Sequence, residues 1–393
     1  MKKIIAIAIS VLLCSTQAIQ ADDWGSKNQF NPVQTGVSSL SIAPDSRGGG
    51  MGDVGVATDA DVYSQHWNPA KYPFNISRAG VGLSYTPWLR QLVNDIDLAY
   101  LSGFYRIGDY SALSGSLRYF SLGEVPLDYD KETGNAIDVI NPYEMALDVA
   151  YSRMLSETFS AAVALRFIYS DMSTHMDDGT APGSAFAADI AFYYNNYIML
   201  GQRECMLGFG LNASNIGSKI SYDEGSTSVF LPTNLGIGAS LLVPIDEYNT
   251  LSFNADINKL MVPTVPMQME DEDDSDYQDR LQKDYYDQSP ITGIFKSFGD
   301  APGGLEEELK EIQWSVGLEY MYNNQFAIRA GYHHEDPYKG NRKYYTVGAG
   351  FKMNVFSLDA SYVISVAQTN PLDQTLRFSL SFDMDGLRDI FGR

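Results

Sequence analysis

The sequence predicts an all-β protein, a 14-stranded antiparallel transmembrane β-barrel with an N-terminal plug and long extracellular loops. Three observations lead to this fold class. Apolar residues alternate with small or polar residues over most of the chain, the non-apolar faces carry few charges, and short connections alternate with long ones. A tilted strand needs roughly 9–11 residues to cross a bilayer, which most of the alternating segments reach.

The first 21 residues are typical of a cleaved signal peptide. Lys2 and Lys3 precede a short apolar run, residues 4–13, and a more polar stretch that ends at Ala21. We therefore expect export and cleavage near Ala21. Cys14 raises the alternative of a lipoprotein, but Leu13 is larger than the residue that usually precedes a lipidated cysteine.

Composition excludes several classes of protein. The chain has 27 Lys and Arg against 49 Asp and Glu, a net charge of −22, which argues against nucleic-acid binding. Aromatic residues make up 12% of the chain, which excludes general disorder. Two Cys and four His leave little material for a metal centre, and neighbouring His333 and His334 point to opposite faces of a strand. We expect no metal and no cofactor.

The barrel strands follow from the period of two. One example places apolar side chains at every second position from Phe159 to Tyr169, opposed by Ser160, Arg166 and other small or polar residues. An even number of strands is the rule for single-chain bacterial barrels. The fourteen expected strands are residues 78–87, 95–106, 110–121, 143–154, 158–170, 185–196, 204–215, 229–243, 249–259, 311–322, 326–335, 343–352, 355–366 and 374–383.

The connections indicate an orientation. Tight turns at 107–109, 155–157, 245–248, 323–325 and 353–354 alternate with longer segments at 122–142, 171–184, 216–228, 260–310, 336–342 and 367–373. Short turns of such barrels face the periplasm and long loops face outward. Residues 88–94 form a short outward connection, and 197–203 a long periplasmic turn.

A large soluble sandwich also alternates, so two further features favour the membrane. The sparse charges, such as Arg166, Asp189 and Glu319, fit a polar lumen better than a solvated face. Aromatic residues gather at the expected strand ends, as in the girdles at membrane interfaces. They are Tyr119, Phe120, Tyr169, Tyr193, Tyr194, Tyr322, Tyr344 and Tyr345.

Residues 22–77 do not alternate and are expected to form a plug, or hatch, in the barrel mouth. A periplasmic cap without a gating role remains the alternative. Glycines allow close backbone approach, and Asn-Pro is a turn signal. The motif residues are Arg47, Gly48, Gly49, Gly50, Gly52, Trp67, Asn68 and Pro69.

The motif "RGGGMGDVGVA" followed by "WNPA" resembles the N-terminal hatch of fatty-acid-transporter-like (FadL) barrels. Residues 289–312, 214–222 and 370–386 resemble the PorV/PorQ branch of that family, so the likeness covers nearly the whole mature chain. This branch belongs to type IX secretion. The resemblance implies a non-enzymatic component in the cell outer membrane.

The resemblance also implies partners. Members of the branch associate with a giant translocon barrel (Sov or SprA), collect cargo proteins by a C-terminal signal domain and deliver them to an attachment complex. That complex contains the sortase PorU, which performs the peptidase chemistry. Outer-membrane lipid is the remaining expected contact.

Residues 260–310 form the longest loop and the expected partner-binding site. An acidic run from Glu270 to Asp287 precedes a short apolar cluster, Ile291, Ile294, Phe295 and Phe298. Exposed apolar clusters commonly mark partner surfaces. A lid folded over the barrel mouth is the alternative for the cluster. A calcium loop of the EF-hand type does not fit the acidic run, because Asp276 and Gln282 stand where Gly and Glu are required.

Two other functions remain for comparison. A transporter of hydrophobic compounds would need an apolar path, whereas the expected inward faces carry Ser, Gly and charged residues. An enzyme acting on outer-membrane lipid is suggested by the name LptO, which is used in the PorV/PorQ branch and records a proposed link to lipopolysaccharide deacylation. No residue set in the sequence supports that chemistry.

Overall fold

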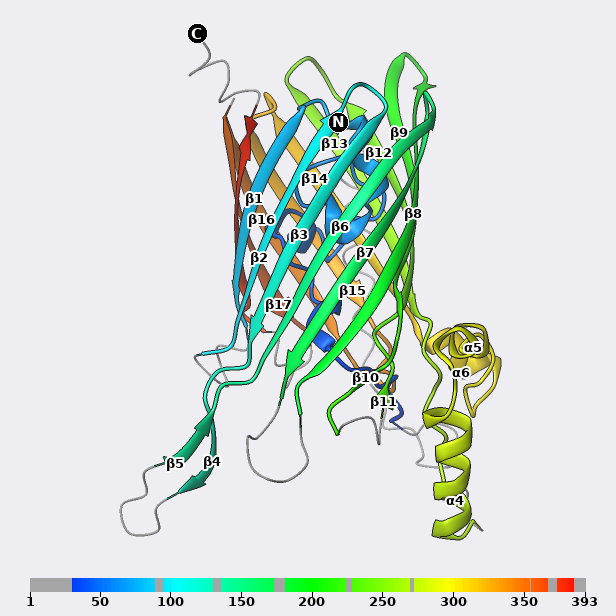
Figure 1. Cartoon of the computed structure of the whole chain (residues 1–393). Coiled ribbons are helices and arrows are strands. Elements are labelled where there is room, and N and C mark those ends of the chain that lie inside the picture. The colour runs from blue at the N-terminus through cyan, green and yellow to red at the C-terminus, as the bar shows by residue number, and fades with distance from the viewer. Residues whose placement is uncertain are drawn as a thin grey trace.

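In the computed structural model, fourteen strands form a closed antiparallel barrel (Figure 1). The structure describes residues 30–88, 95–129, 136–172, 181–223, 228–268, 272–353, 355–366 and 373–384. The barrel strands are β1 (Ala79–Pro87), β2 (Asp97–Ile107), β3 (Ser111–Ser121), β6 (Tyr143–Ser156), β7 (Phe159–Asp171), β8 (Gly183–Leu200), β9 (Arg203–Gly217), β12 (Asn234–Pro244), β13 (Asn249–Leu260), β14 (Ile312–Tyr322), β15 (Phe326–His334), β16 (Lys343–Lys352), β17 (Phe356–Ser365) and β18 (Leu376–Asp383).

The ring closes where the first strand meets the last. β1 pairs with β18, with Tyr85 opposite Phe378 and Gly80 opposite Asp383. Closure matters because a bilayer offers no water to satisfy backbone groups at a sheet edge. The predicted strand number and topology are confirmed, although β12 begins at Asn234, five residues after the predicted start at 229.

Several predictions concern segments outside the described residues. The signal peptide at 1–21 with Cys14, the first residues of the expected plug and the tail after Met384 lie there. The connection at 89–94 and parts of the loops at 122–142, 171–184, 216–228 and 367–373 do as well. No helix in the described parts of the chain is long and apolar enough to cross a membrane.

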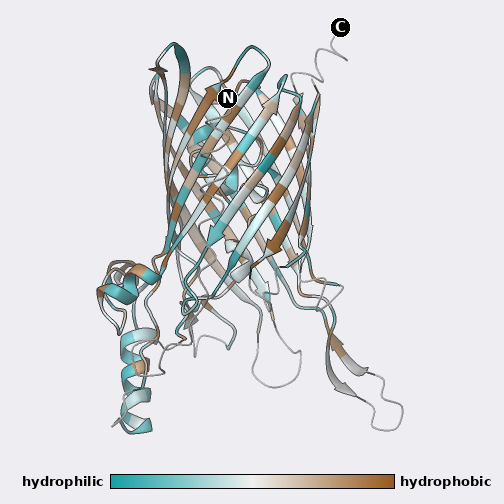
Figure 2. Cartoon of the chain, turned by 180° about the vertical axis from the view of Figure 1, so that it is seen from behind, coloured by the Kyte–Doolittle hydropathy of each residue, from teal (hydrophilic) through white to brown (hydrophobic). Residues whose placement is uncertain are grey.

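Side chains alternate between the lipid-facing surface and the lumen along most of the barrel strands. In β7, Val163 and Leu165 are more than half exposed, whereas Ser160, Ile168 and Ser170 are fully buried. Brown apolar positions therefore recur along the barrel strands, while helix α4 (Asp274–Leu281) is mostly teal (Figure 2). The outward faces form the apolar surface that the membrane requires.

Aromatic rings gather on the outward faces near the strand ends. Tyr119, Tyr143 and Tyr169 stack across three neighbouring strands, with centroids 5.6 and 5.9 Å apart. The prediction was wrong for Phe120, Tyr193 and Tyr344, which are buried and face inward. The reason is the period of two, because only one residue of two successive aromatics can face lipid.

The two ends of the barrel differ (Figure 1). We call the end with the tight connections, including 108–110 and 323–325, the turn end. Residues 197–203 were predicted as a long turn, but β8 and β9 extend to leave only Gly201 and Gln202 between them. At the opposite, loop end lie two small sheets, β4 (Val125–Tyr129) with β5 (Ala136–Ile140) and β10 (Ile220–Ser221) with β11 (Ser228–Val229).

The longest connection, 261–311, forms helices at the loop end, beside the barrel (Figure 1). We call it the external loop. Its elements are α4, a π-helical turn η3 (Gln282–Tyr286), α5 (Pro290–Lys296) and α6 (Leu305–Lys310). The acidic run was expected as loop, but its residues 274–281 form α4. Asp274 and Asp276 lie in its first turn, where negative charge is favourable.

Residues Asn31–Asn75, the lumenal segment, run through the barrel from the loop end to the turn end. Gly36 N–H donates to Phe230 O near the loop end, and Arg106 donates to Asn75 O near the turn end. Between these contacts, the segment bonds to side chains on β18, β6 and β13 around the ring. Its short helices are η1 (Ser38–Ser41), α2 (Ser46–Gly49), α3 (Ser64–Trp67) and η2 (Pro69–Phe74).

Gly331 on β15 tests how closely the wall fits this segment. A Cβ at Gly331 would lie 2.0 Å from the Met51 carbonyl carbon, so Gly331→Ala is expected to displace the lumenal segment from the barrel wall. Lipid-facing Gly103 is the control, since the atom nearest to a Cβ there would be Gly80 O, at 3.3 Å. We expect Gly331→Ala to lower the temperature at which the folded barrel's gel mobility is lost. If Gly331→Ala and Gly103→Ala lose the gel mobility of the folded barrel at the same temperature, the close packing of the wall on the lumenal segment is contradicted.

Candidate functional site

Two regions contain the candidate residues, the lumenal segment and the external loop. In the first, Arg47 of α2 lies at the centre of an ion-pair network. Its guanidinium contacts Asp59, reaches Asp61 at 3.0 Å and reaches Glu319 of the barrel wall at 2.9 Å. Burial lowers the pKa of Arg47, but the three carboxylates outweigh burial and hold it well above its usual value. Arg47 is therefore a permanent cation in the lumen.

The network continues around the wall. Glu319 on β14 also accepts from Arg329 on β15 at 2.6 Å, and Arg329 donates to Asp359 on β17 at 2.6 Å. Each of these three side chains is less than 10% exposed. Arg47 thus ties the lumenal segment directly to β14 and, through Glu319 and Arg329, to β15 and β17.

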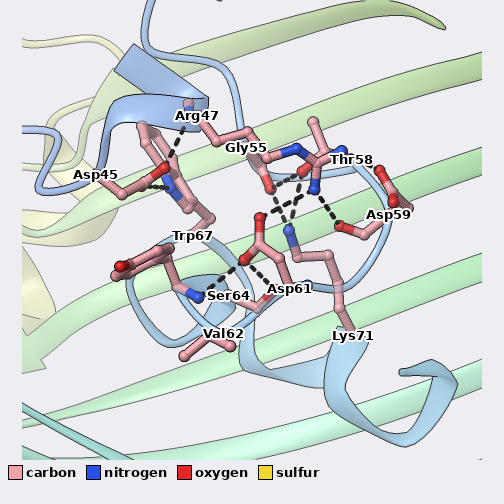
Figure 3. A network of polar contacts seen from close by, with 12 residues as sticks. Asp45, Arg47, Gly55, Thr58, Asp59, Asp61, Val62, Ser64, Trp67 and Lys71 are labelled. Carbon is pink, nitrogen blue, oxygen red and sulfur yellow. Dashed lines mark hydrogen bonds and ion pairs between the residues drawn. The ribbon is translucent and has the colours of Figure 1, made fainter. Parts of the chain in front are cut away.

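Asp45 and Trp67 fasten two parts of the lumenal segment to each other (Figure 3). The Asp45 carboxylate accepts from Gly48 N–H at 2.8 Å and from Trp67 Nε1–H at 2.7 Å. A Cβ at Gly48 would lie 2.6 Å from the Trp67 ring, so only glycine fits. The predicted motif residues Gly48 and Trp67, 19 positions apart, are therefore in contact.

Gly52 provides the turn after α2. Its φ is +79°, a conformation that favours glycine, and its N–H donates to Thr346 at 2.8 Å. The following residue, Asp53, accepts from Tyr344 at 2.5 Å and from Arg377 at 2.7 Å. These wall contacts come from β16 and β18.

The second half of the motif is held by amides. Asn68 caps η2 through Ala70 N–H and donates to Phe192 O at 2.9 Å, and Pro69 occupies the first turn of η2. Gly49 and Gly50 lie close to Arg377 and Gly348 of the wall. All eight predicted motif residues therefore lie within the lumenal segment, where the contacts described hold it in place.

Sequence reasoning missed two anchors, Asp256 and Lys71. Asp256 on β13 accepts from Gly55 N–H at 2.7 Å and Val56 N–H at 2.9 Å. Lys71 is fully buried and donates to Gly55 O at 2.8 Å and Thr58 Oγ at 3.0 Å (Figure 3). Burial lowers the pKa of Lys71. A lysine directly after "NPA" carried no periodic signal that would have placed it inside.

Two small cavities adjoin the lumenal segment. One cavity of about 140 Å³ lies toward the turn end, beside Arg47, Asp59 and Asn75. A second, of about 110 Å³, lies between Leu40, Trp67 and the wall residue Asn212. Sites for drug-sized ligands usually measure roughly 300–1,000 Å³. Neither cavity is large enough for a long acyl chain.

The external loop presents an apolar surface. Ile291, Phe295 and Phe298 are 66%, 76% and 50% exposed, whereas Ile294 is half-buried. Ile294 lies at the edge of the face that carries positions 291, 295 and 298, on the side of the buried residues Gly293 and Ser297, where α5 packs on Phe230. The predicted cluster is thus divided between an outer face and a packing face.

Two further residues extend this surface. Leu305 and Leu309, one turn apart on α6, are 80% and 67% exposed. Their spacing of four residues in "LEEEL" was the available signal. We define the external apolar face as Ile291, Phe295, Phe298, Leu305 and Leu309.

Ion pairs hold the external loop to the barrel. Lys259, on the lipid-facing side of β13, reaches Glu308 at 3.1 Å and Glu311 at 2.6 Å. Lys339 reaches the same Glu311 at 3.0 Å. These ion pairs therefore fix the part of the external loop that carries the external apolar face. In the described residues, no group of three or more metal-ligating side chains occurs.

Comparison with protein families gives a match to the family described as "Type IX secretion system protein PorV", over residues 25–267. The match covers more than half of the chain. The chain belongs to the PorV family. It is accordingly an outer-membrane barrel protein of type IX secretion.

Solved barrels are similar at low identity. The Pseudomonas putida toluene transporter TodX is 10% identical with a TM-score of 0.49, over 90% of this chain and 99% of that chain. The Ralstonia pickettii toluene transporter TbuX is 12% identical with a TM-score of 0.44, over 91% and 97%. A Pseudomonas aeruginosa FadL homologue is 13% identical with a TM-score of 0.40, over 90% and 99%. Comparison with curated proteins gave no match.

Arg47→Ala tests the central ion pairs. Removing one partner of a buried ionic network costs about 3–5 kcal/mol, because charges remain buried without compensation. We expect a lower denaturant midpoint in detergent, relative to Arg203→Ala at the exposed β8–β9 turn. Similar midpoints for the two variants would mean that the network does not stabilise the fold.

Asp45 predicts a dependence of stability on pH. Burial, followed by the charge of Asp61, raises the pKa of Asp45 from 3.8 to about 6. The folded state therefore binds more protons than the unfolded state between these values, so the contribution of Asp45 to stability falls as pH rises from about 4 to 6.

Asp45→Asn removes this titration. The difference in unfolding free energy between parent and variant should change with pH across that window, by roughly 1.4 kcal/mol for each unit of pKa difference. Denaturant midpoints at pH 4, 5, 6 and 7 measure it. A parent-to-variant difference that is constant with pH would contradict the raised pKa.

Proposed function

We propose that this protein is a non-enzymatic docking component of type IX secretion. It associates with the translocon barrel, binds the C-terminal signal domain of cargo and delivers cargo to the sortase-containing attachment complex. The single observation that carries this proposal is the external apolar face. Five large apolar side chains, each at least half exposed, are held outside the barrel by ion pairs rather than folded over its mouth.

The chemistry of this face suits protein recognition. Large exposed apolar patches at the surface of a folded protein mark interaction sites. Acidic residues flank it, Glu306 and Glu307 on α6 and the acids of α4, and they favour a partner with a basic rim. Apolar contacts would supply affinity, and the acids would speed encounter.

The occupied lumen argues against the alternative, a FadL-like transporter of hydrophobic compounds. The lumenal segment is pinned by buried ions on several strands, and the two cavities measure about 140 and 110 Å³. A transported hydrophobic compound would have to displace these ion pairs. Uptake of a radiolabelled fatty acid above the level of cells without the protein would favour transport instead.

The decisive test changes the external apolar face. Ile291→Asp with Phe295→Asp is preferred to a variant at Ile294, because half-buried Ile294 contributes to the packing of the loop. An apolar side chain fully buried in an interface contributes roughly 1.5–3 kcal/mol. We expect the double variant to weaken capture of the translocon barrel, sortase or cargo signal domain by tenfold or more.

Co-purification of each partner from cells measures the effect. Val139→Asp on β5 is the matched control, since it places the same charge at an exposed apolar position away from the face. Heat-dependent gel mobility confirms folding of each variant. If the double variant folds and retains every partner at the parent level, the docking surface lies elsewhere.

A further inference from the structure

The first described part of the lumenal segment is an extended strap, Asn31–Val37, at the loop end. Three hydrogen bonds hold it to loops. Asn31 N–H donates to Tyr338 O at 3.0 Å, Gly36 N–H to Phe230 O at 2.9 Å, and the Tyr285 hydroxyl to Gln34 O at 3.2 Å. None of these partners belongs to a barrel strand. These hydrogen bonds of the strap therefore go to elements of the loop end, while its last residue, Val37, also packs against the barrel wall at β6, β7 and β8.

The chain beyond the strap is held differently. In η1, Ser39 N–H donates to the carboxylate of Glu144 on β6 at 3.1 Å. Arg118 on β3 donates to Ser39 O and to Ile42 O. Charged wall residues thus anchor η1, whereas the hydrogen bonds of the strap go to loop residues, and the change of partner falls at Val37.

Val37 is strained where the partners change. Its φ is +50°, a left-handed conformation in which a β-branched residue is an outlier. Such residues persist only where surrounding contacts impose them, and they cluster at switch regions. Val37 is buried in one apolar cluster with Ile220 and Leu231 and with the wall residues Ala146, Ile168, Ala185 and Ala187. Loss of those contacts would release the strain and favour movement of the strap.

The external loop supplies one of the strap's contacts through Tyr285. This residue lies in the π-helical turn η3, a feature frequent at functional sites. Its ring meets Phe230 edge-on at 5.4 Å, and both rings pack with Val33 of the strap. Lys219, directly before β10, donates to Tyr285 O at 3.2 Å and so helps to hold this turn in place.

Helix α5 touches the same ring. A Cβ at Gly293 would lie 2.9 Å from the Phe230 ring, so the packing face of α5 rests on Phe230. The opposite face of α5 presents Ile291 and Phe295. Phe230 therefore contacts α5, Tyr285 and the strap at once.

We infer that the strap is a latch whose state is coupled to the external apolar face through Phe230 and Tyr285. A partner that shifts α5 loosens the contacts of Phe230, the strap lifts, and the residues under it become exposed to solvent. Ile220 is one of these residues, because it is fully buried and a Cβ added at Gly36 would lie 2.8 Å from its side chain. The cavity of about 110 Å³ beside Leu40 and Ala43 adjoins this region and provides free volume for the movement.

The test measures the opening in the isolated protein. Ile220→Cys places a thiol under the strap, and the rate of its reaction with a bulky maleimide in detergent reports exposure. Native Cys205 is fully buried, and the protein without the new cysteine gives the background. Gly293→Ala displaces α5 from Phe230, whereas Gly299→Ala in the same loop meets nothing within 4 Å.

We expect Gly293→Ala to raise the labelling rate at least fivefold and Gly299→Ala to leave it unchanged. Tyr285→Phe, which removes only the hydroxyl bond to Gln34, should raise it about threefold. Tyr277→Phe on exposed α4 is its control. Equal rates across all variants, or equal increases in variant and control, would overturn the coupling. Heat-dependent gel mobility excludes variants that have lost the barrel fold.

The inference rests on the proposed function only for the identity of the partner. Labelling of the isolated protein needs no partner, so the latch fails independently if Gly293→Ala has no effect. If the variant Ile291→Asp with Phe295→Asp still co-purifies with every partner, docking through the external apolar face is refuted. The labelling result would not be affected.

Discussion

The charge in the lumen is the constraint on which the structure depends. A barrel of fourteen strands turns Glu319, Arg329, Asp256 and Arg377 inward, where few of their atoms reach solvent. Buried charges are costly unless they are paired and hydrogen-bonded. The lumenal segment supplies the partners, including Arg47, Asp53 and the N–H groups of Gly55 and Val56. Wall and segment are therefore complementary, and neither would be stable in this form without the other.

The same principle holds the external loop in place at the other side of the wall. Lys259 ends the lipid-facing column of β13, and Glu308 and Glu311 neutralise it where the apolar surface ends. The pairs set α5 and α6 beside the barrel rather than over its mouth. The strap lies at the loop end, where the Tyr285 hydroxyl of the external loop donates to Gln34 O. Phe230 thus contacts both the external loop and the strap of the lumenal segment.

These features favour a role for the surface over a role for the lumen. Transport requires a path, and the cavities beside the lumenal segment are small and bounded by ion pairs. Docking requires an accessible, anchored surface, and the external apolar face has both properties. Membership of the PorV family agrees with a place in secretion, while the choice of partner for each loop depends on the surface chemistry argued above.

Sequence alone determined the barrel, its strand number and the division into lumenal segment and wall. The period of two can be read from the local sequence, so the faces on which Val163 and Ser160 lie are predictable without knowing which residues they contact. Tertiary structure decided which residues meet. The alternation of its strand places Asp256 in the lumen, but its partners are backbone groups brought near only by barrel closure, and Lys71 gave no signal at all. Likewise, Ile294 and Phe295 are both large apolar residues in the same short cluster. Only the packing of α5 on Phe230 makes the Ile294 side chain half-buried and leaves the Phe295 side chain exposed.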